Sequence, residues 1–216
     1  MKLIIFLLRT FFSLLYHQFA WTYDLIAATV SLGRWKSWVK SSIPYLEGRI
    51  LEIGYGPGHL QQALHEQGSA VFGMDESRQM AQQARQRLRR NSFPINLVRG
   101  EAQYLPFQRH TFDTVVSTFP SEYIFDSKTL REARRVLCPE GKMVILPMAW
   151  ITGTRPLERL AAWLFRITGE APGKPKPIST MVRDQFMRAG FEVRSELVTL
   201  KGSQLLFYIA TSSRFP

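Results

Sequence analysis

The stretch Ile50–Leu60, ILEIGYGPGHL, decides the fold, because it sets three glycines between a short apolar run and a helix-like segment. A loop that leaves a strand and enters a helix turns its backbone amides and the helix dipole toward whatever binds there. Gly54, Gly56 and Gly58 let a ligand approach that backbone closely. The stretch predicts a strand–loop–helix unit that holds a dinucleotide or another adenosine compound.

Two residues of this stretch help to separate the ligand classes. The dinucleotide fingerprint G-x-G-x-x-G needs a glycine where His59 stands. Glu52 ends the strand just before the loop, where a carboxylate would repel a pyrophosphate and favour a cation. S-adenosylmethionine carries a sulfonium and an ammonium, and its carboxylate can accept hydrogen bonds from the loop amides. The loop therefore favours S-adenosylmethionine over a dinucleotide.

Asp75 ends the next predicted strand, 17 residues after Gly58. At this place a carboxylate suits hydrogen bonding to the two ribose hydroxyls of an adenosine ligand. Both NAD and S-adenosylmethionine offer that ribose, so Asp75 does not decide between them. A purely structural role, capping the following helix together with Ser77, is the alternative.

Apolar runs and helix-like segments alternate from residue 49 onward. The predicted strands are 49–53, 70–74, 95–98, 112–117 and 142–147, and the predicted helices are 57–67, 77–90, 130–137 and 180–189. Residues 191–200 and 204–211 read as a final hairpin around Lys201-Gly202-Ser203. We therefore expect an α/β fold: a Rossmann-like, mostly parallel seven-stranded sheet with helices on both faces and a C-terminal antiparallel hairpin.

The first thirty residues are strongly apolar but do not read as a simple membrane span. Arg9 breaks the first apolar run, no small-residue cleavage site follows it, and a longer window takes in His17 and Asp24. As a helix, the segment would carry one narrow polar stripe, so its wide apolar face must be covered. Two covers remain open: the segment caps its own domain, or it lies in a membrane interface.

The formal net charge of +11 indicates an anionic neighbour, which can be nucleic acid, an anionic membrane surface or an acidic substrate. Arginines of two predicted helices supply much of this charge, and solvated helix faces explain them equally simply. Because a basic protein is attracted to anionic lipid, the charge favours membrane contact over a cap on the domain for residues 1–30. Cys138 is the single cysteine, which excludes an intrachain disulfide and a Cys-based zinc cage. We expect no metal site and a cytoplasmic protein, peripheral on the inner face of the membrane.

Five motifs then follow one another in order. They are E-x-G-x-G-x-G (52–58), M-D-E-S-x-x-M (74–80), G-E-A with L-P-F (100–107), F-D-T-V-V (112–116) and L-x-P-x-G (137–141). This order resembles the class I S-adenosylmethionine-dependent methyltransferases, most closely the subgroup with quinone C-methyltransferases and phospholipid N-methyltransferases. The resemblance covers about residues 48–147 and, more loosely, the C-terminal hairpin. It implies S-adenosylmethionine as the cofactor.

The resemblance also implies a set of cofactor-binding residues. Glu52 would orient the loop and the ammonium of the cofactor through water, and Asp75 would bind the ribose. Glu101 would accept from the adenine amino group, and Thr118 and Phe119 would line the methyl-transfer site. The full set is Glu52, Gly54, Tyr55, Gly56, Gly58, Asp75, Glu76, Met80, Glu101, Ala102, Thr118 and Phe119.

Methyl transfer from a sulfonium needs alignment and exclusion of water more than it needs a strong base. A carbon or hydroxyl acceptor would still want a base, whereas an amine needs only its neutral form. The candidates are Glu122 and Tyr123 after the fourth strand, and Tyr16, His17 and Tyr23 in the N-terminal segment. Surface, core or helix-face roles explain each of them equally well, so the catalytic residue stays unassigned.

The predicted organisation is an N-terminal apolar or amphipathic helical segment (1–47) and a methyltransferase domain (48–216). Residues 149–178, with Trp150, Trp163 and a Pro/Gly/Lys linker, would form a lid inserted over the substrate. The Asn/Asp-Pro-Pro-aromatic run of many nucleic-acid and protein N-methyltransferases is replaced by TFPS at 118–121. The leading hypothesis is therefore methylation of a small apolar or lipid-like acceptor. An RNA or protein methyltransferase, an NAD-dependent oxidoreductase and a non-catalytic membrane-docked module are the alternatives.

Overall fold

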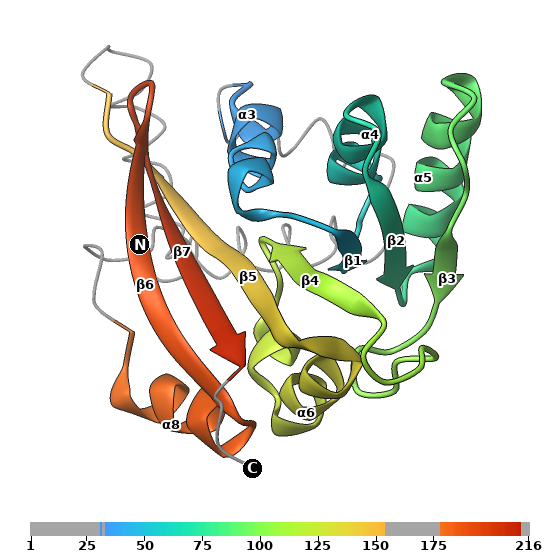
Figure 1. Ribbon diagram of the computed structural model, residues 1–216. Coiled ribbons are helices and arrows are strands. Elements are labelled where there is room, and N and C mark those ends of the chain that lie inside the picture. The colour runs from blue at the N-terminus through green and yellow to red at the C-terminus, as the bar shows by residue number, and fades with distance from the viewer. Residues whose placement is uncertain (1–30, 32, 154–177, 213–216) are drawn as a thin grey trace, which may run out of the picture.

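The computed structural model of the protein describes residues 31, 33–153 and 178–212. Within them a seven-stranded sheet runs in the order β3-β2-β1-β4-β5-β7-β6 (Figure 1). The strands are β1 (Arg49–Ile53), β2 (Ala70–Asp75), β3 (Leu97–Arg99), β4 (Phe112–Thr118), β5 (Leu137–Ile151), β6 (Phe191–Leu200) and β7 (Ser203–Ser212). Strands β1 to β5 pair in parallel, and β7 pairs antiparallel with both β5 and β6. This confirms the predicted sheet and its C-terminal hairpin.

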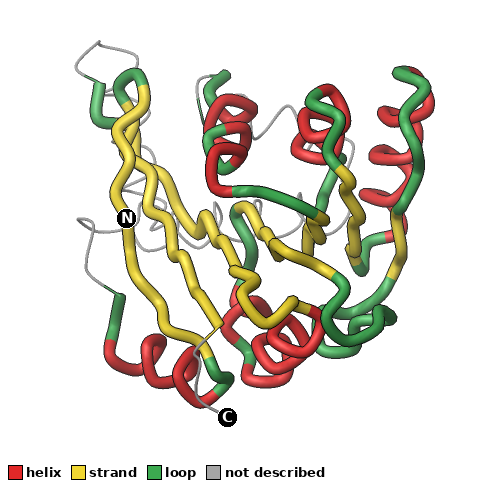
Figure 2. The backbone as a smooth tube through the Cα atoms, viewed as in Figure 1, coloured by secondary structure: helices red, strands yellow, loops and turns green. Residues whose placement is uncertain are grey.

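Helices cover both faces of the sheet, as predicted. The α-helices are α3 (Trp35–Lys40), α4 (His59–Glu66), α5 (Arg78–Arg90), α6 (Ser127–Val136) and α8 (Thr180–Arg188), with 3-10 turns η2 (Ile43–Tyr45) and η3 (Glu122–Phe125). Figure 1 shows α3, α4 and α5 on one side of the sheet and α6 and α8 on the other, and Figure 2 shows the strands running between these two layers. The parallel sheet is therefore shielded on both faces.

Strand β1 lies at the centre of the sheet and is buried on both faces. Because successive side chains of a strand point to opposite faces, Leu51 and Ile53 join the core under α6, whereas Ile50 joins the core under α3 and α4. All three are at most 1% exposed. A central strand buried in this way reads as a continuous apolar run, which is why the sequence predicts it well.

Strand β5 is much longer than the predicted 142–147. It begins directly after α6 and continues to Ile151, pairing with β7 as far as Ile151 opposite Ser203. Pro147 does not end it, because the β5–β7 register shifts between Ile145 and Met148, where a proline costs no ladder hydrogen bond. Residues 149–151 of the predicted lid belong to β5, and residues 154–177 of it lie outside the described part of the chain, so the lid stays a prediction.

Other boundaries differ by a few residues. Strand β3 lies at residues 97–99, where it pairs with β2, and not at the predicted 95–98. Helix α6 begins three residues earlier than predicted, because Asp126 caps it by accepting a hydrogen bond from the amide of Lys128. Ser77 caps α5 in the same way, accepting from the Met80 amide.

Helix α3 and the turn η2 lie in the described part of the segment that precedes the first motif. The buried residues of α3, Trp38 and Val39, pack against the apolar core on the α4 side of the sheet. None of the helices in the described ranges is long and apolar enough to cross a membrane. The apolar residues 1–30, with the candidates Tyr16, His17 and Tyr23, fall outside those ranges.

Candidate active site

A cavity of about 590 Å³ opens where β1, β2 and β4 end. It lies at the point where the strand order reverses between β1 and β4, the usual ligand crevice of an open α/β sheet. Its lining consists of Ile53, Gly54, Gly56, Met74, Asp75, Glu76, Ser77, Gln79, Met80, Gly100, Glu101, Ala102, Gln103, Thr118, Phe119, Pro120, Ser121 and Tyr123. Most of the predicted cofactor set is therefore gathered around one cavity.

The glycine loop between β1 and α4 forms one wall of this cavity. Gly54 and Gly56 have φ values of 73° and 52°, in the left-handed region that favours glycine. The Gly54 amide donates a 2.7 Å hydrogen bond to the Met74 carbonyl, which holds the loop to the end of β2. A methyl group on Gly54 would meet the Tyr123 hydroxyl, whereas one on Gly56 would meet nothing within 4 Å. The loop therefore leaves room for a ligand beside Gly56.

Gly58 has a different role from the predicted contact with the cofactor. It is absent from the cavity lining and stands at the N-cap of α4 with φ 82°. An added Cβ there would lie 2.9 Å from the Cβ of Ala84, so Gly58 permits close packing of the loop on α5. Its place in the motif reflects backbone conformation and helix packing.

Asp75, at the end of β2, forms part of a second wall of the cavity. Its Oδ2 accepts a 2.8 Å hydrogen bond from the Gly56 amide, and its Oδ1 accepts one of 2.8 Å from the Ser77 amide. Burial raises the pKa of Asp75, although the two amide bonds act in the opposite direction. Each carboxylate oxygen can accept a further hydrogen bond. Asp75 can therefore position the loop and still accept from the hydroxyls of a ribose.

Glu52 lies beneath the loop and is not part of the cavity lining, so of its predicted roles the orientation of the loop is the one that its position allows directly. Its side chain is 1% exposed, and its Oε2 accepts a 2.8 Å hydrogen bond from Gln61 Nε2. Burial raises the pKa of Glu52 to about 8, the Gln61 bond lowers it, and the charge of Asp75 raises it. Glu52 is therefore mostly protonated at neutral pH in this state, and it supports the loop from below.

Tyr55 is also directed away from the cavity, contrary to its predicted place in the cofactor set. It is 3% exposed and packs with Ala81, Ala84, Leu88 and Leu97 between β2, β3 and α5. The next residue, Gly56, faces the cavity, so the loop alternates between core and ligand. The sequence does not indicate the direction of each side chain in the loop, because this direction depends on the φ angles of the glycines.

Tyr123 lines the cavity with its hydroxyl beside Gly54. The Tyr123 hydroxyl is hydrogen-bonded with Ser117. Because Ser117 Oγ already donates its proton to the Ile53 carbonyl at 2.7 Å, Tyr123 is the donor in its own hydrogen bond with Ser117 Oγ. Burial raises the pKa of Tyr123 to about 12. Near neutral pH this phenol can donate a hydrogen bond but cannot serve as a base. Glu122, the other candidate in this segment, is exposed and does not line the cavity.

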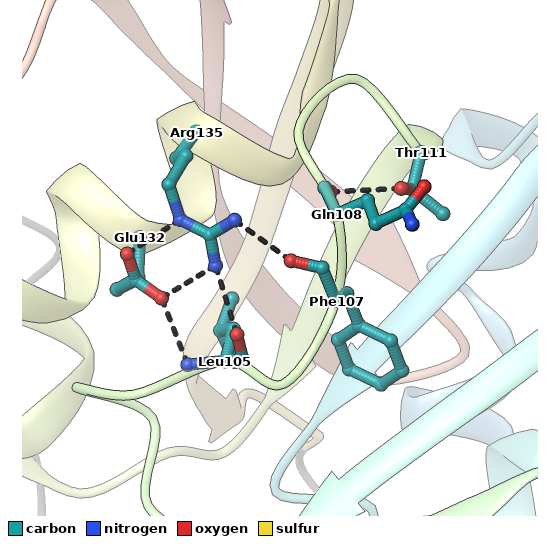
Figure 3. A network of polar contacts seen from close by, with 6 residues as sticks. All are labelled: Leu105, Phe107, Gln108, Thr111, Glu132 and Arg135. Carbon is teal, nitrogen blue, oxygen red and sulfur yellow. Dashed lines mark hydrogen bonds and ion pairs between the residues drawn. The ribbon is translucent and has the colours of Figure 1, made fainter.

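Sequence reasoning missed Ser117, although a polar residue near the end of a buried strand was a usable signal. It also placed the arginines of α6 on a solvated face, which is wrong for Arg135. Figure 3 shows its guanidinium holding the loop after β3: it donates to the Phe107 carbonyl at 2.7 Å and to the Leu105 carbonyl at 2.8 Å. Glu132 pairs with Arg135 at 2.7 Å and accepts from the Leu105 amide at 2.9 Å. This network steadies the segment that carries Glu101 and Ala102 to the cavity.

The residues present fit S-adenosylmethionine better than a dinucleotide. Among the described residues the lining carries the carboxyl groups of Asp75, Glu76 and Glu101 and no lysine or arginine that would balance a pyrophosphate. A sulfonium and an ammonium are cations, which a wall of carboxylates attracts. The volume also lies within the range of small-ligand pockets, roughly 300–1,000 Å³. The open backbone at Gly56 and the carboxylate of Asp75 are the groups that would hold the methionine and ribose portions.

Comparisons with known proteins show that the chain is similar to methyltransferases. A family described as "Methyltransferase domain" matches residues 51–145. A demethylmenaquinone methyltransferase of Shouchella clausii is 30% identical over 204 residues, which is 79% of this chain and 83% of that protein. A ubiquinone/menaquinone biosynthesis C-methyltransferase of Geotalea daltonii is 30% identical over 134 residues, 57% of each chain. A putative S-adenosylmethionine-dependent methyltransferase structure from Methanococcus maripaludis has a TM-score of 0.63 at 22% identity, covering 91% of this chain and 93% of that one.

Fold, cavity and relatives together define the class of protein: an S-adenosylmethionine-dependent methyltransferase of class I, and the chain belongs to that family. Within it, the chain is similar to a demethylmenaquinone methyltransferase and to a ubiquinone/menaquinone biosynthesis C-methyltransferase. The protein is therefore an enzyme that uses S-adenosylmethionine, and the NAD-dependent oxidoreductase and the non-catalytic module are not favoured.

Proposed function

We propose that the protein methylates a ring carbon of a lipid-like quinol. The observation that carries this proposal is the part of the lining that follows β4, where the side chains of Thr118, Phe119, Pro120 and Tyr123 carry no charge at neutral pH. An apolar acceptor suits such a wall, and a charged one would be desolvated there without a partner. The names of the relatives, demethylmenaquinone methyltransferase among them, support a quinone nucleus as that acceptor.

The chemistry asks little of the protein beyond alignment. S-adenosylmethionine, when bound, supplies a methyl group on a sulfonium, which is electrophilic without further activation. In the proposed reaction the acceptor carbon would take this methyl group, the electron pair of the broken carbon–sulfur bond would leave with S-adenosylhomocysteine, and the proton lost from the ring carbon would pass to solvent. Asp75 and the Gly54–Gly56 backbone would fix the donor. Tyr123 stays protonated at neutral pH and donates its proton to Ser117, so its oxygen can accept a hydrogen bond from a hydroxyl of the acceptor.

A comparison of acceptors tests this proposal. The full-length protein is incubated with S-adenosylmethionine labelled in the methyl group and, separately, with quinol, phospholipid, RNA and protein fractions. The proposal expects label in the quinol fraction after chemical reduction, and little without reduction, because only the quinol has the electron-rich ring carbon. Label in RNA or protein alone would contradict the proposal and would favour the alternative, an RNA or protein methyltransferase that uses the basic surface.

We also propose that the protein works at the cytoplasmic face of a membrane, bound peripherally. The net charge of +11 supports this, as do the exposed arginines of α5, a helix that contains no acidic residue. Flotation with vesicles tests the proposal: binding to anionic lipid should exceed binding to zwitterionic lipid, fall with added salt, and weaken when Arg85 and Arg89 are replaced by Gln. Equal flotation with both lipids at low salt would overturn it.

A further inference from the structure

Phe119 stands at the exit of β4 in a backbone conformation that its residue type rarely adopts. Its φ is 50°, in the left-handed region that crowds a residue with a Cβ. Pro120 follows it, and a residue before proline normally takes an extended backbone. The Phe119 amide donates a 2.7 Å hydrogen bond to the Leu146 carbonyl, which ties the turn to β5. A strained conformation of this kind persists only where its surroundings hold it.

Two indole rings from α3 provide such support. The ring centroid of Trp35 lies 4.1 Å from that of Phe119 with 31° between the planes, and that of Trp38 lies at 6.2 Å and 42°. Aromatic pairs at these separations attract beyond the area they bury. Trp38 belongs to the buried core, whereas Trp35 is partly buried at its edge. Trp35 is therefore the closer partner of Phe119, and its side chain can be changed with less damage to the core.

Phe119 belongs to this aromatic contact and to the cavity lining at once. The lining residues that adjoin it in sequence are Thr118 and Pro120, and Tyr123 follows one turn later. None of these side chains carries a charge at neutral pH. The donor side of the cavity, with Asp75, comes from β2. We therefore assign the acceptor to the uncharged residues that follow β4. Among them, Phe119 offers an aromatic ring to a flat acceptor.

We propose that Phe119 is the wall on which a planar, conjugated acceptor ring stacks, and that Trp35 is the positioning residue that holds this wall. The proposal rests on the proposed function, because it takes the methyl acceptor to be a quinol-type ring. A flat ring gains from stacking on Phe119, whereas a flexible aliphatic chain of similar hydrophobicity gains little from ring orientation. Helix α3, which precedes the methyltransferase motifs in sequence, is by this account part of the acceptor site.

Ligand binding without turnover tests the proposal. Equilibrium dialysis of the full-length protein measures the dissociation constants of 1,4-naphthoquinone and of 1-decanol, and calorimetry measures that of S-adenosylhomocysteine. Trp35→Leu, which keeps apolar volume but removes the ring, should weaken naphthoquinone binding about three- to tenfold. Trp35→Phe should restore it to within about twofold, because a ring again faces Phe119. Decanol and S-adenosylhomocysteine binding should not change in either variant.

Tyr45→Leu is the matched control. Tyr45 packs its ring on Phe207 at a centroid distance of 4.9 Å on the same side of the sheet, and neither residue lines the cavity. The Tyr45→Leu substitution should alter the melting temperature of the protein but not its binding of naphthoquinone. The proposal is overturned if wild type prefers decanol, if Trp35→Leu binds naphthoquinone as wild type does, or if all three ligands weaken together. Failure of the proposed function has a different signature: naphthoquinone binds as expected and no quinol is methylated.

Discussion

Asp75 Oδ2 accepts a 2.8 Å hydrogen bond from the amide of Gly56, so the end of β2 fixes the loop that follows β1. The acid and the glycine loop are therefore one unit, although the sequence presents them as separate motifs. A ligand that donates hydrogen bonds to Asp75 is thereby also placed against the open backbone at Gly56.

Replacing Asp75 by Ala should weaken the binding of S-adenosylmethionine. The loss of hydrogen bonds to a charged group, at about 1.5–3 kcal/mol each, corresponds to roughly a 10- to 100-fold rise in the dissociation constant measured by calorimetry. Asp126→Ala is the control, because Asp126 accepts from the amide two residues ahead just as Asp75 does, but caps α6 away from the cavity. Unchanged affinity in Asp75→Ala would show that the donor binds elsewhere.

Gly54→Ala should destabilise the protein more than Gly68→Ala. Both glycines have nearly the same φ, 73° and 75°, so the backbone strain of the two substitutions is similar. The new methyl group at position 54 meets the Tyr123 hydroxyl, whereas at position 68 it meets nothing within 4 Å. The difference in melting temperature therefore isolates the clash with Tyr123. Adding Tyr123→Phe to Gly54→Ala should recover part of it, and equal melting temperatures for the two single variants would contradict this geometry.

Glu52→Gln should stabilise the protein increasingly as the pH rises. The folded-state pKa of Glu52 is raised from the ordinary 4.5 to about 8, so its favourable contribution is complete below the unfolded pKa and is lost as the pH rises through the folded one. The variant cannot ionise and escapes that loss. Its melting temperature should match wild type at about pH 5 and exceed it at about pH 8.

The control for this pH dependence is Glu66→Gln on α4, whose carboxylate is 44% exposed and lies 3.7 Å from Lys40 Nζ. Its difference from wild type should stay nearly constant across the same range. A Glu52→Gln melting curve that runs parallel to wild type from acid to alkaline pH would mean that the buried carboxyl titrates normally.

Arg135→Ala should cost about 2–3 kcal/mol in the free energy of unfolding by urea, because it removes hydrogen bonds from a charged donor to two carbonyls of one loop. Arg131→Ala, at an exposed position of the same helix, should change it by less than about 0.5 kcal/mol. Arg135 also lowers the pKa of Glu132, chiefly by hydrogen bonding. The stabilisation by this pair is present above the unfolded pKa of Glu132 and fades as the pH falls through the folded one, so the gap between the two variants should narrow in acid, while the part due to the two carbonyl hydrogen bonds remains. A constant gap would argue against the ion pair.

Much of the fold could be predicted because its central strands are buried on both faces and so read as apolar runs. Residues 49–53 and 112–117 are examples, and the glycine loop and Asp75 follow from the places where such strands end. The long β5 could not be predicted, because Pro147 looks like a strand end. Only the register shift against β7, a tertiary feature, accommodates it.

The site was predictable only in part, for a related reason. Motif positions indicate that a residue is near the ligand, but the direction of its side chain depends on the backbone. Tyr55 and Gly56 are neighbours, yet one enters the core and the other faces the cavity. The contact of Trp35 with Phe119 joins segments far apart in the chain, and no local pattern signals it.

The most direct measurement is transfer of a trideuteromethyl group from labelled S-adenosylmethionine to a short-chain demethylmenaquinol, followed by mass spectrometry of the extracted quinone. The proposed function predicts a trideuteromethyl group on a ring carbon of the product, formed by wild type and lost in Asp75→Ala. An extracted quinone without label, from protein that binds S-adenosylmethionine normally, would contradict it.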